Sequence, residues 1–388
     1  MDEPTHARRE QETRGAALWR RVDASHVRRG AQFLINISVP LLVGVLLGES
    51  QIALAAVIVG MAFGFADSAG SLFSRLRFLA LDAFCIGAGA VLGYLARSHA
   101  ALLVPLFVGL KLGVGLSPLI GRMLPLTSRH AAMAFTVAAA LPVTFNLRQA
   151  SYLFGVFLLA AAARTIDYLI AGPLLRQPAV PLQPPSGHGG WLRYALAFAG
   201  AATAALWIAQ ALDPTHTIWV VATTLVVMQA DARLSYRRIV ERIAGTFAGV
   251  VAAWVITGSQ SIALISACIL VVAPLIPHHL ANRYWLHTAL IALMILLAYD
   301  LAEFDSQSIS KLLFERVIDM LLGCAIALVG TAAAFPRTAV ADLDGLSKTD
   351  GFGREGADRA PRRQQAARDG SAGCESSEGG IAHGAFGH

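Results

Sequence analysis

The chain has 388 residues, of which 56% are hydrophobic and only 14% are charged, and its mean hydropathy is +0.59. Soluble domains carry about 25% charged residues, so this composition excludes an ordinary soluble protein and predicts a polytopic membrane protein. Residues 30–335 contain 17 of the 31 basic and 12 of the 25 acidic side chains. The net charge of +6 therefore fits loops that face an anionic membrane surface, and no nucleic-acid partner is expected.

Apolar runs of membrane-spanning length recur between residues 31 and 335. A helix needs about 20 apolar residues to cross a bilayer, and helix is expected because an open strand leaves backbone groups unsatisfied in lipid. Several runs are short, so an alternative model has ten spans with two short segments re-entrant, for example in the pair 31–66. The expected spans are 31–48, 52–66, 78–96, 100–118, 131–146, 150–173, 192–211, 216–230, 243–257, 261–276, 284–299 and 312–335.

The placement of arginine predicts the orientation of these spans. Cytoplasmic loops are enriched in Lys and Arg. The segment 233–242 is rich in arginine, whereas the loops around Pro214 and Gly258 contain no Lys or Arg. Twelve spans with 233–242 inside put both termini in the cytoplasm.

Composition also predicts the divisions of the chain. A Pro- and Gly-rich stretch reads as a linker, and a long polar end that cannot bury a core reads as disordered. The predicted parts are a cytoplasmic polar tail at 1–29, a first six-helix repeat at 30–176, a linker at 177–190, a second six-helix repeat at 191–336 and a disordered cytoplasmic tail at 337–388.

The two halves contain similar motifs in the same order. Six spans per half is an even number, so the repeats are expected to be parallel and related by an axis along the membrane normal. The fold class predicted is therefore all-α, with about twelve short transmembrane helices in two parallel six-helix repeats. The matching positions are Arg164 with Arg316, Asp167 with Asp319 and Thr136 with Thr288, each 152 apart, and Arg77 with Arg242, 165 apart.

Two stretches of the second half carry more specific motifs. The first has the basic run Arg237-Arg238 and then Gly245-Thr246-Phe247-Ala248-Gly249, and the second has Arg316-Val317-Ile318-Asp319 ahead of Gly323. Together they resemble the fusaric acid resistance and aromatic acid exporter (FUSC) family. Its pattern is an arginine-rich cytoplasmic turn, Gly-Thr-x-x-Gly opening a helix, and a later Arg-x-x-Asp ahead of a glycine. The resemblance covers roughly residues 200–335, and in the first half Ala80-Leu81 stand where Gly-Thr would be.

The resemblance implies a carrier in the bacterial inner membrane that exports organic, in particular aromatic, carboxylic acids and is driven by the proton gradient. Two alternatives stay open: an anion channel without proton coupling, and a membrane scaffold that transports nothing. The expected partners are a small organic anion and the lipid bilayer, and GxxxG faces permit a homo-oligomer. No cofactor is expected.

Charged residues inside apolar spans are costly and are functional candidates by default. An Arg and an Asp three apart share one helix face and could simply neutralise each other. Alternatively, each Arg offers a planar donor fork to a carboxylate, and its Asp takes up a proton. The substrate-binding candidates are Arg316, Arg164, Lys111, Thr288 and Thr136, and the proton-coupling candidates are Asp319, Asp167 and Asp82.

Some of these residues also have simpler interpretations. Lys111 is expected to extend toward the cytoplasmic interface rather than to contact substrate. Thr136 and Thr288 could each bond to a backbone carbonyl of their own helix. Small residues four apart let helices approach closely, and this packing role is predicted for Gly245, Thr246, Gly249, Gly89 and Gly93.

An enzyme is not expected. His278 and His279 are adjacent, so they point in different directions on a helix, and the other histidines are scattered. The sequence contains no HExxH, serine-triad or metal-ligand spacing. A catalytic residue and a metal site are therefore not predicted.

Overall fold

The computed structural model describes residues 24–97, 99–120, 124–140, 146–174, 187–212, 217–279, 283–302 and 309–336. Within these ranges the regular elements are helices. The predicted tail 337–388, most of the predicted tail 1–29 and most of the predicted linker 177–190 lie outside the described residues.

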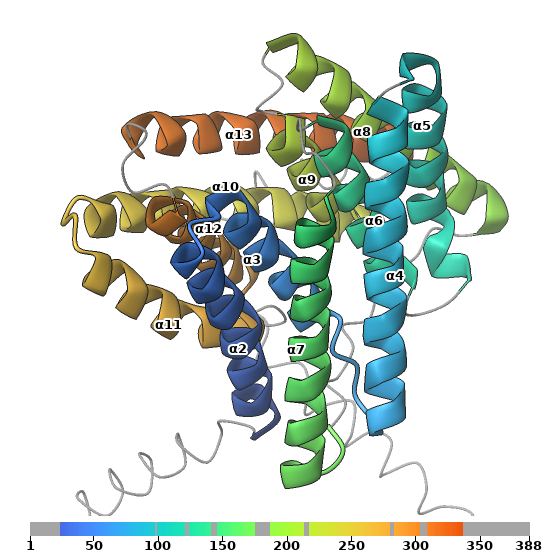
Figure 1. Ribbon diagram of the computed structural model, residues 1–388. Coiled ribbons are helices and arrows are strands. Elements are labelled where there is room, and N and C mark those ends of the chain that lie inside the picture. The colour runs from blue at the N-terminus through green and yellow to red at the C-terminus, as the bar shows by residue number, and fades with distance from the viewer. Residues whose placement is uncertain are drawn as a thin grey trace, which may run out of the picture. The chain divides into compact units, whose positions relative to one another are not determined.

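Each predicted span overlaps one α-helix of the described chain (Figure 1). A short 3₁₀ turn, η1 (Ser117–Leu119), follows α5. The first half contains α2 (Ala24–Leu46), α3 (Ser50–Phe65), α4 (Leu72–Arg97), α5 (Ala100–Leu116), α6 (Leu124–Ala140) and α7 (Leu147–Ala171). The second half contains α8 (Gly187–Leu212), α9 (Thr217–Val227), α10 (Ala232–Thr257), α11 (Ile262–His279), α12 (Tyr284–Ala302) and α13 (Ile309–Ala334).

Eight of these helices are long and apolar enough to cross a membrane: α2, α4, α5, α7, α8, α10, α12 and α13. Helices α3, α9 and α11 are apolar but shorter. In Figure 1, α10 and α13 run across the direction of α4, α6 and α7. The protein is thus an all-α membrane protein, and the arrangement of about twelve spans as two parallel six-helix repeats remains a prediction.

Several helices begin well before their predicted starts, α4 and α10 among them. The chain is helical from Leu72 rather than from residue 78, and from Ala232 rather than from residue 243. At the second of these starts Asp231 is the N-cap, and its Oδ1 accepts a hydrogen bond from the backbone N–H of Leu234 at 3.0 Å. Hydropathy marks the apolar part of a helix, whereas capping decides where the helix begins. The arginines at 237, 238 and 242 therefore lie on a helix and not in a turn.

The two halves use the same helix neighbours when α2–α7 are matched in order with α8–α13. Helix α4 packs on α6 as α10 packs on α12, and α3 packs on α7 as α9 packs on α13. Between the halves, α2 packs on α11 as α8 packs on α5. One apolar core joins α5 and α6 to α8, α9 and α13, and a second joins α2 and α3 to α10, α11 and α12. Each core therefore contains helices from both halves.

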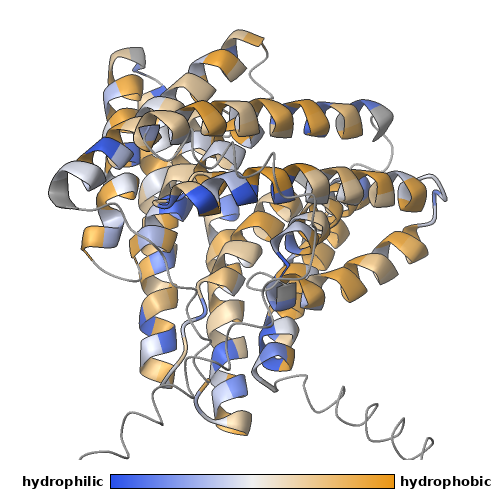
Figure 2. Cartoon of the chain, turned by 180° about the vertical axis from the view of Figure 1, so that it is seen from behind, coloured by the Kyte–Doolittle hydropathy of each residue, from blue (hydrophilic) through white to orange (hydrophobic). Residues whose placement is uncertain are grey.

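The outer faces of the long helices expose large apolar side chains, among them Phe73, Ile170, Trp254 and Val329. Figure 2 shows apolar colouring along most helices, with hydrophilic positions gathered on only a few of them. Apolar surface of this extent is unfavourable in water and suits contact with lipid.

Candidate functional site

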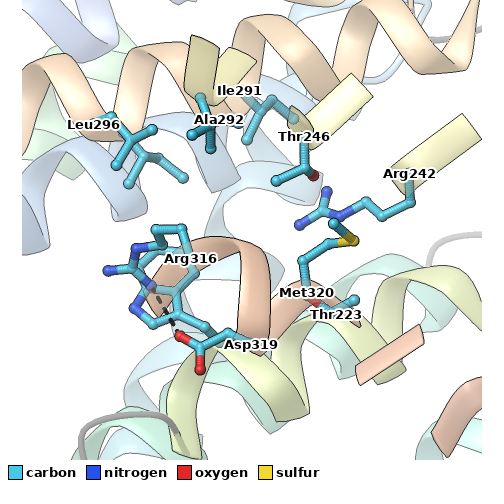
Figure 3. Close-up of a pocket in the computed structure, with 12 residues that line it drawn as sticks. Thr223, Arg242, Thr246, Ile291, Ala292, Leu296, Arg316, Asp319 and Met320 are labelled. Atoms are coloured by element: carbon cyan, nitrogen blue, oxygen red, sulfur yellow. Dashed lines mark ion pairs between the residues drawn. The ribbon is translucent and has the colours of Figure 1, made fainter. Parts of the chain in front are cut away.

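A small pocket, partly open to the surroundings, lies between α9, α10, α12 and α13. Its wall is largely apolar, with Ile291, Ala292 and Leu296 on α12. Figure 3 shows Arg242 and Thr246 from α10 and Arg316 and Asp319 from α13 around the same space. The polar and aromatic lining residues are Trp219, Thr223, Arg242, Thr246, Arg316 and Asp319.

Arg316 is held in this pocket mainly by aromatic rings. Its guanidinium carbon lies 3.6 Å from the ring centroid of Trp219 and 5.4 Å from that of Tyr299. Its Nη1 is 3.9 Å from Asp319 Oδ2, which is too long for a hydrogen bond. Nε and Nη1 are buried and have no hydrogen-bond partner among the described residues. The guanidinium is therefore oriented by cation–π contacts, with two donor atoms available.

Two other polar residues of the pocket also have atoms without partners. Arg242 Nε and Thr246 Oγ1 are buried without a hydrogen-bond partner in the described part of the chain, and so is Thr288 Oγ1 at the α10–α12 crossing. Such atoms are uncommon in folded proteins because each costs about 1–3 kcal/mol when unsatisfied. Two arginines and one aspartate line the pocket, so its formal charge is positive and it suits an anion.

Four glycines lie at close helix crossings. A Cβ added at Gly245 or Gly249 on α10 would lie closer than 3.0 Å to a backbone carbonyl oxygen of α12. A Cβ added at Gly89 or Gly93 on α4 would meet α6 in the same way. These crossings hold α10 against α12 beside the pocket and α4 against α6 in the first half.

The crossings correct the alignment of the two halves. Gly89 stands 156 positions before Gly245, and Gly93 stands 156 positions before Gly249. Gly89-Ala90 is therefore the first-half counterpart of Gly245-Thr246, and the alignment on Ala80-Leu81 was wrong. That alignment matched arginines, whereas backbone contact between helices decides which positions are equivalent.

The pairing expected within Arg164-x-x-Asp167 does not occur. Arg164 Nε contacts Asp67 Oδ1 at 3.3 Å, and its Nη atoms donate to the backbone carbonyls of Phe63 and Ala160. Asp167 instead accepts from Arg28 and Arg75. Partners from other helices are closer to these two charges than they are to each other.

Asp67 and Arg75 complete this first-half charge network, which comprises Arg28, Asp67, Arg75, Arg164 and Asp167. Arg75 donates two hydrogen bonds of 2.9 Å to the carboxylate of Asp67 and one of 2.6 Å to Asp167 Oδ2. Arg75, Asp67 and Arg164 are almost fully buried. Sequence reasoning missed Asp67, although an acid directly after the apolar run 52–66 was a usable signal.

Lys111 does not extend to an interface, so that prediction was wrong. Its side chain is completely buried, and its Nζ donates to the carbonyl of Ala132 at 3.0 Å. Nζ also lies 3.4 Å from Thr136 Oγ1 and 4.4 Å from the ring centroid of Phe107. The core between α5 and α6 surrounds the amine, and Lys111 and Thr136 do not line the pocket beside Arg316.

The two threonines also differ in environment. Thr136 Oγ1 donates to the carbonyl of Ala132 on its own helix at 2.8 Å. Thr288 instead lies at the α10–α12 crossing, beside Gly245. The carbonyls that face Gly89 and Gly245 belong to Ala131 and Trp285, so equivalent positions on α6 and α12 are 154 apart. Thr136 and Thr288 are 152 apart and are therefore not equivalent.

Asp82 pairs with a histidine that sequence reasoning set aside as scattered. His130 Nδ1 on α6 lies 2.9 Å from Oδ1 and 3.1 Å from Oδ2 of Asp82 on α4. Both side chains are buried. The residues are 48 positions apart, so no local spacing in the sequence could have shown the pair. No group of three or more His, Cys, Asp or Glu side chains that could hold a metal ion occurs among the described residues.

Comparison with known proteins agrees with the resemblance seen in the motifs. Residues 203–330 match the model of the fusaric acid resistance protein-like family. This segment is therefore similar to the FUSC family. It includes Trp219, Arg242, Thr246, Arg316 and Asp319, so the polar part of the pocket lies within it.

A relative from Haemophilus influenzae, described as an uncharacterized protein, is 28% identical to this chain over 130 residues. The matched stretch is 33% of this chain and 18% of that protein, so the chain spans only a small part of this relative. No solved structure matches the chain. The match to the FUSC family model and the eight apolar helices together indicate a membrane protein.

Proposed function

We propose that the protein is an efflux carrier for organic, in particular aromatic, carboxylic acids in a bacterial inner membrane, with both termini in the cytoplasm. One observation carries this proposal: the buried guanidinium of Arg316 stacks on Trp219 and keeps two donor atoms unpartnered beside an apolar pocket. A planar guanidinium matches the geometry of a carboxylate, and an apolar wall suits the rest of an aromatic acid.

The substrate carboxylate would accept hydrogen bonds from Arg316, with Arg242 and Thr246 adding donors from the facing helix. Its ring would lie against Ile291 and Leu296. Asp319 lies 3.9 Å from Arg316, so it competes with the substrate for the cation. Proton uptake by Asp319 would remove that competition, which is one route to coupling.

The common set of helix neighbours supports two parallel six-helix repeats. Since the two apolar cores described above both contain helices from both halves, a movement of one half would shift the other. Transporters built from repeats alternate access by moving one repeat against the other around a fixed site. The pocket beside Arg316 is the site that we assign to this protein.

Transport by purified protein in liposomes tests the proposal. Wild type should accumulate aromatic acids, from a panel, under an imposed pH gradient. Arg316→Lys should lower transport about tenfold or more, because a Lys ammonium cannot reproduce the two-donor fork and a charged hydrogen bond is worth about 1.5–3 kcal/mol.

The matched control is Arg237→Lys. Arg237 lies on α10, exposed, with its Nε 2.8 Å from Glu241 Oε1, and this change should leave transport unaltered. Equal transport by Arg316→Lys and wild type would contradict the proposed site. Currents that follow the anion gradient without proton movement would indicate a channel, and no flux of any acid would indicate a scaffold.

A further inference from the structure

The Asp82–His130 pair has no part in the pocket beside Arg316. It lies between α4 and α6, the helices that Gly89 and Gly93 bring together. Asp82 is completely buried, and His130 is 9% exposed. The Nδ1–H of the ring donates to the carboxylate at 2.9 Å. Its Nε2 has no hydrogen-bond partner among the described residues. A buried carboxylate that orients an imidazole leaves the second ring nitrogen as a site for a proton.

The charged groups around the pair already have partners of their own. On α7, Arg164 interacts electrostatically with Asp82 but contacts Asp67. On α5, the amine of Lys111 binds the Ala132 carbonyl, two residues beyond His130. Cys85 follows on α4, one turn after Asp82, and interacts with it electrostatically.

The other helices that pack on α4 and α6 add no further charged partner to this pair among the described residues. Asp67, beyond the end of α3, binds Arg75 of α4, and the described residues of α9 include no Asp, Glu, Lys, Arg or His. Arg164 is therefore the cation that interacts with Asp82, and binding of a proton would change the net charge of the pair.

The second half has a different contact at the same place. Arg238 is equivalent to Asp82, because each stands seven positions before the first glycine of its crossing, Gly245 or Gly89. Tyr284 is equivalent to His130, because each directly precedes the residue whose carbonyl faces that glycine. Arg238 lies over the ring of Tyr284 at 5.0 Å. Arginine keeps its charge under all ordinary conditions, whereas histidine changes charge close to neutral pH. Of these two equivalent contacts, the first-half pair alone is suited to gain and lose a proton.

We propose that Asp82 and His130 form the proton-binding site that couples transport to the proton gradient. This inference rests on the proposed transport function. It assigns the proton to the first half and the substrate carboxylate to the second. In each cycle His130 accepts one proton from water on one side of the membrane and returns it on the other.

A direct connection leads from this pair toward the pocket. Arg129, next to His130, binds Gln229 Oε1 at 3.4 Å and the carbonyl of Met228 at 3.3 Å, just beyond the end of α9. Helix α9 carries Trp219, on which Arg316 stacks, and α6 packs on α9. A charge gained at His130 thus acts on the helix that forms one wall of the substrate site.

Asp82→Asn and His130→Gln test the assignment, with His99→Gln as the matched control. His99 is exposed, and its Nδ1 lies 3.4 Å from the carbonyl of Leu95. Two assays are compared in liposomes: substrate exchange at equal pH on both sides, and net accumulation driven by a pH gradient. In both Asp82→Asn and His130→Gln, accumulation driven by the pH gradient should fall far more than the rate of substrate exchange. The control His99→Gln should behave as wild type in both assays.

Gradient-driven accumulation at the wild-type level in both variants would overturn the proposal. Loss of accumulation in Asp319→Asn, with Asp82→Asn normal, would also overturn it and move the proton to the pocket. If a single variant does not fold, the double variant Asp82→Asn/His130→Asn, which replaces the pair by two neutral amides, serves instead.

Infrared difference spectra of the purified protein between acid and alkaline pH give a readout that needs no transport. Wild type should show a histidine-ring signal that Asp82→Asn shifts and His130→Gln removes. An unchanged spectrum in His130→Gln would overturn the proton site. If wild type shows the histidine signal but no substrate exchange, the proposed transport function is rejected while the proton-binding site is retained.

Discussion

On α7, Arg164 and Asp167 each bind charged partners from other segments, whereas on α13 Arg316 lies over a tryptophan ring beside a pocket. The same Arg-x-x-Asp motif therefore has two environments. In the first half the charges of the motif are satisfied inside the protein. In the second half two donor atoms of the arginine have no hydrogen-bond partner among the described residues.

The acid that follows the second helix of each half accounts for part of this difference. Asp67 lies in the connection between α3 and α4 and turns into the core, where it binds Arg75 and Arg164. Asp231 directly precedes α10 and caps it. Because the Asp231 carboxylate caps the start of α10, it does not serve as a buried partner for Arg316, as Asp67 does for Arg164.

The largest effect is expected from Asp67→Asn. This change would leave Arg75 and Arg164 buried with one carboxylate fewer, and removing one partner of a buried ion pair costs about 3–5 kcal/mol. We expect thermal unfolding of the detergent-solubilised protein at a much lower temperature. Asp319→Asn is the comparison in the second half, and its effect on stability should be smaller because the Arg316–Asp319 distance is 3.9 Å. Equal losses in both variants would contradict the difference between the halves.

Gly93→Leu and Gly249→Leu should each lower the yield of folded protein. A Cβ at either position would lie closer than 3.0 Å to a carbonyl oxygen of the facing helix, and overpacking costs about 1–3 kcal/mol or more. Size-exclusion chromatography after expression measures the yield. Gly155→Leu is the control, since nothing lies within 4 Å of a Cβ added there. A normal yield for Gly249→Leu would show that the α10–α12 crossing is not as close as described.

Arg164→Lys and Arg316→Lys should have opposite effects. Arg164 contacts Asp67 and two backbone carbonyls, so its replacement should lower thermal stability with little change in substrate affinity. Arg316→Lys should weaken binding of an aromatic acid about tenfold with a smaller loss of stability. Calorimetric titration and thermal unfolding of the same samples separate the two. Weaker binding in Arg164→Lys alone would place the carboxylate site in the first half.

The smallest perturbation tests whether the halves are parallel. His99 precedes α5 and Ser259 precedes α11, and both are exposed. Parallel repeats put these equivalent loops on the same, external side, so His99→Cys and Ser259→Cys should both react with a membrane-impermeant thiol reagent in intact cells. The single variants need a background free of the native cysteines. Labelling of one position only after permeabilisation would show that the repeats are inverted.

The order of the helices and the candidate site residues could be predicted from the amino-acid sequence. Apolar runs, several of them shorter than a full span, located each helix of the described chain, because lipid admits only backbone that is satisfied internally. Small residues four apart, Gly245 with Gly249 and Gly89 with Gly93, marked positions where helices cross. Arg316 and Asp319 were found as charges within an apolar segment.

The partner of each charge was decided only by the tertiary structure. Arg164 could bind its neighbour Asp167 or a carboxylate from elsewhere, and the packing of α3, α4 and α7 brought Asp67 and Arg75 closer. Asp82 met His130 across a glycine crossing, and Lys111 was enclosed by α5 and α6 rather than drawn to an interface. Hydropathy depends on the residues of one helix, whereas a buried charge is stabilised by whichever group the other helices place within a few ångströms of it.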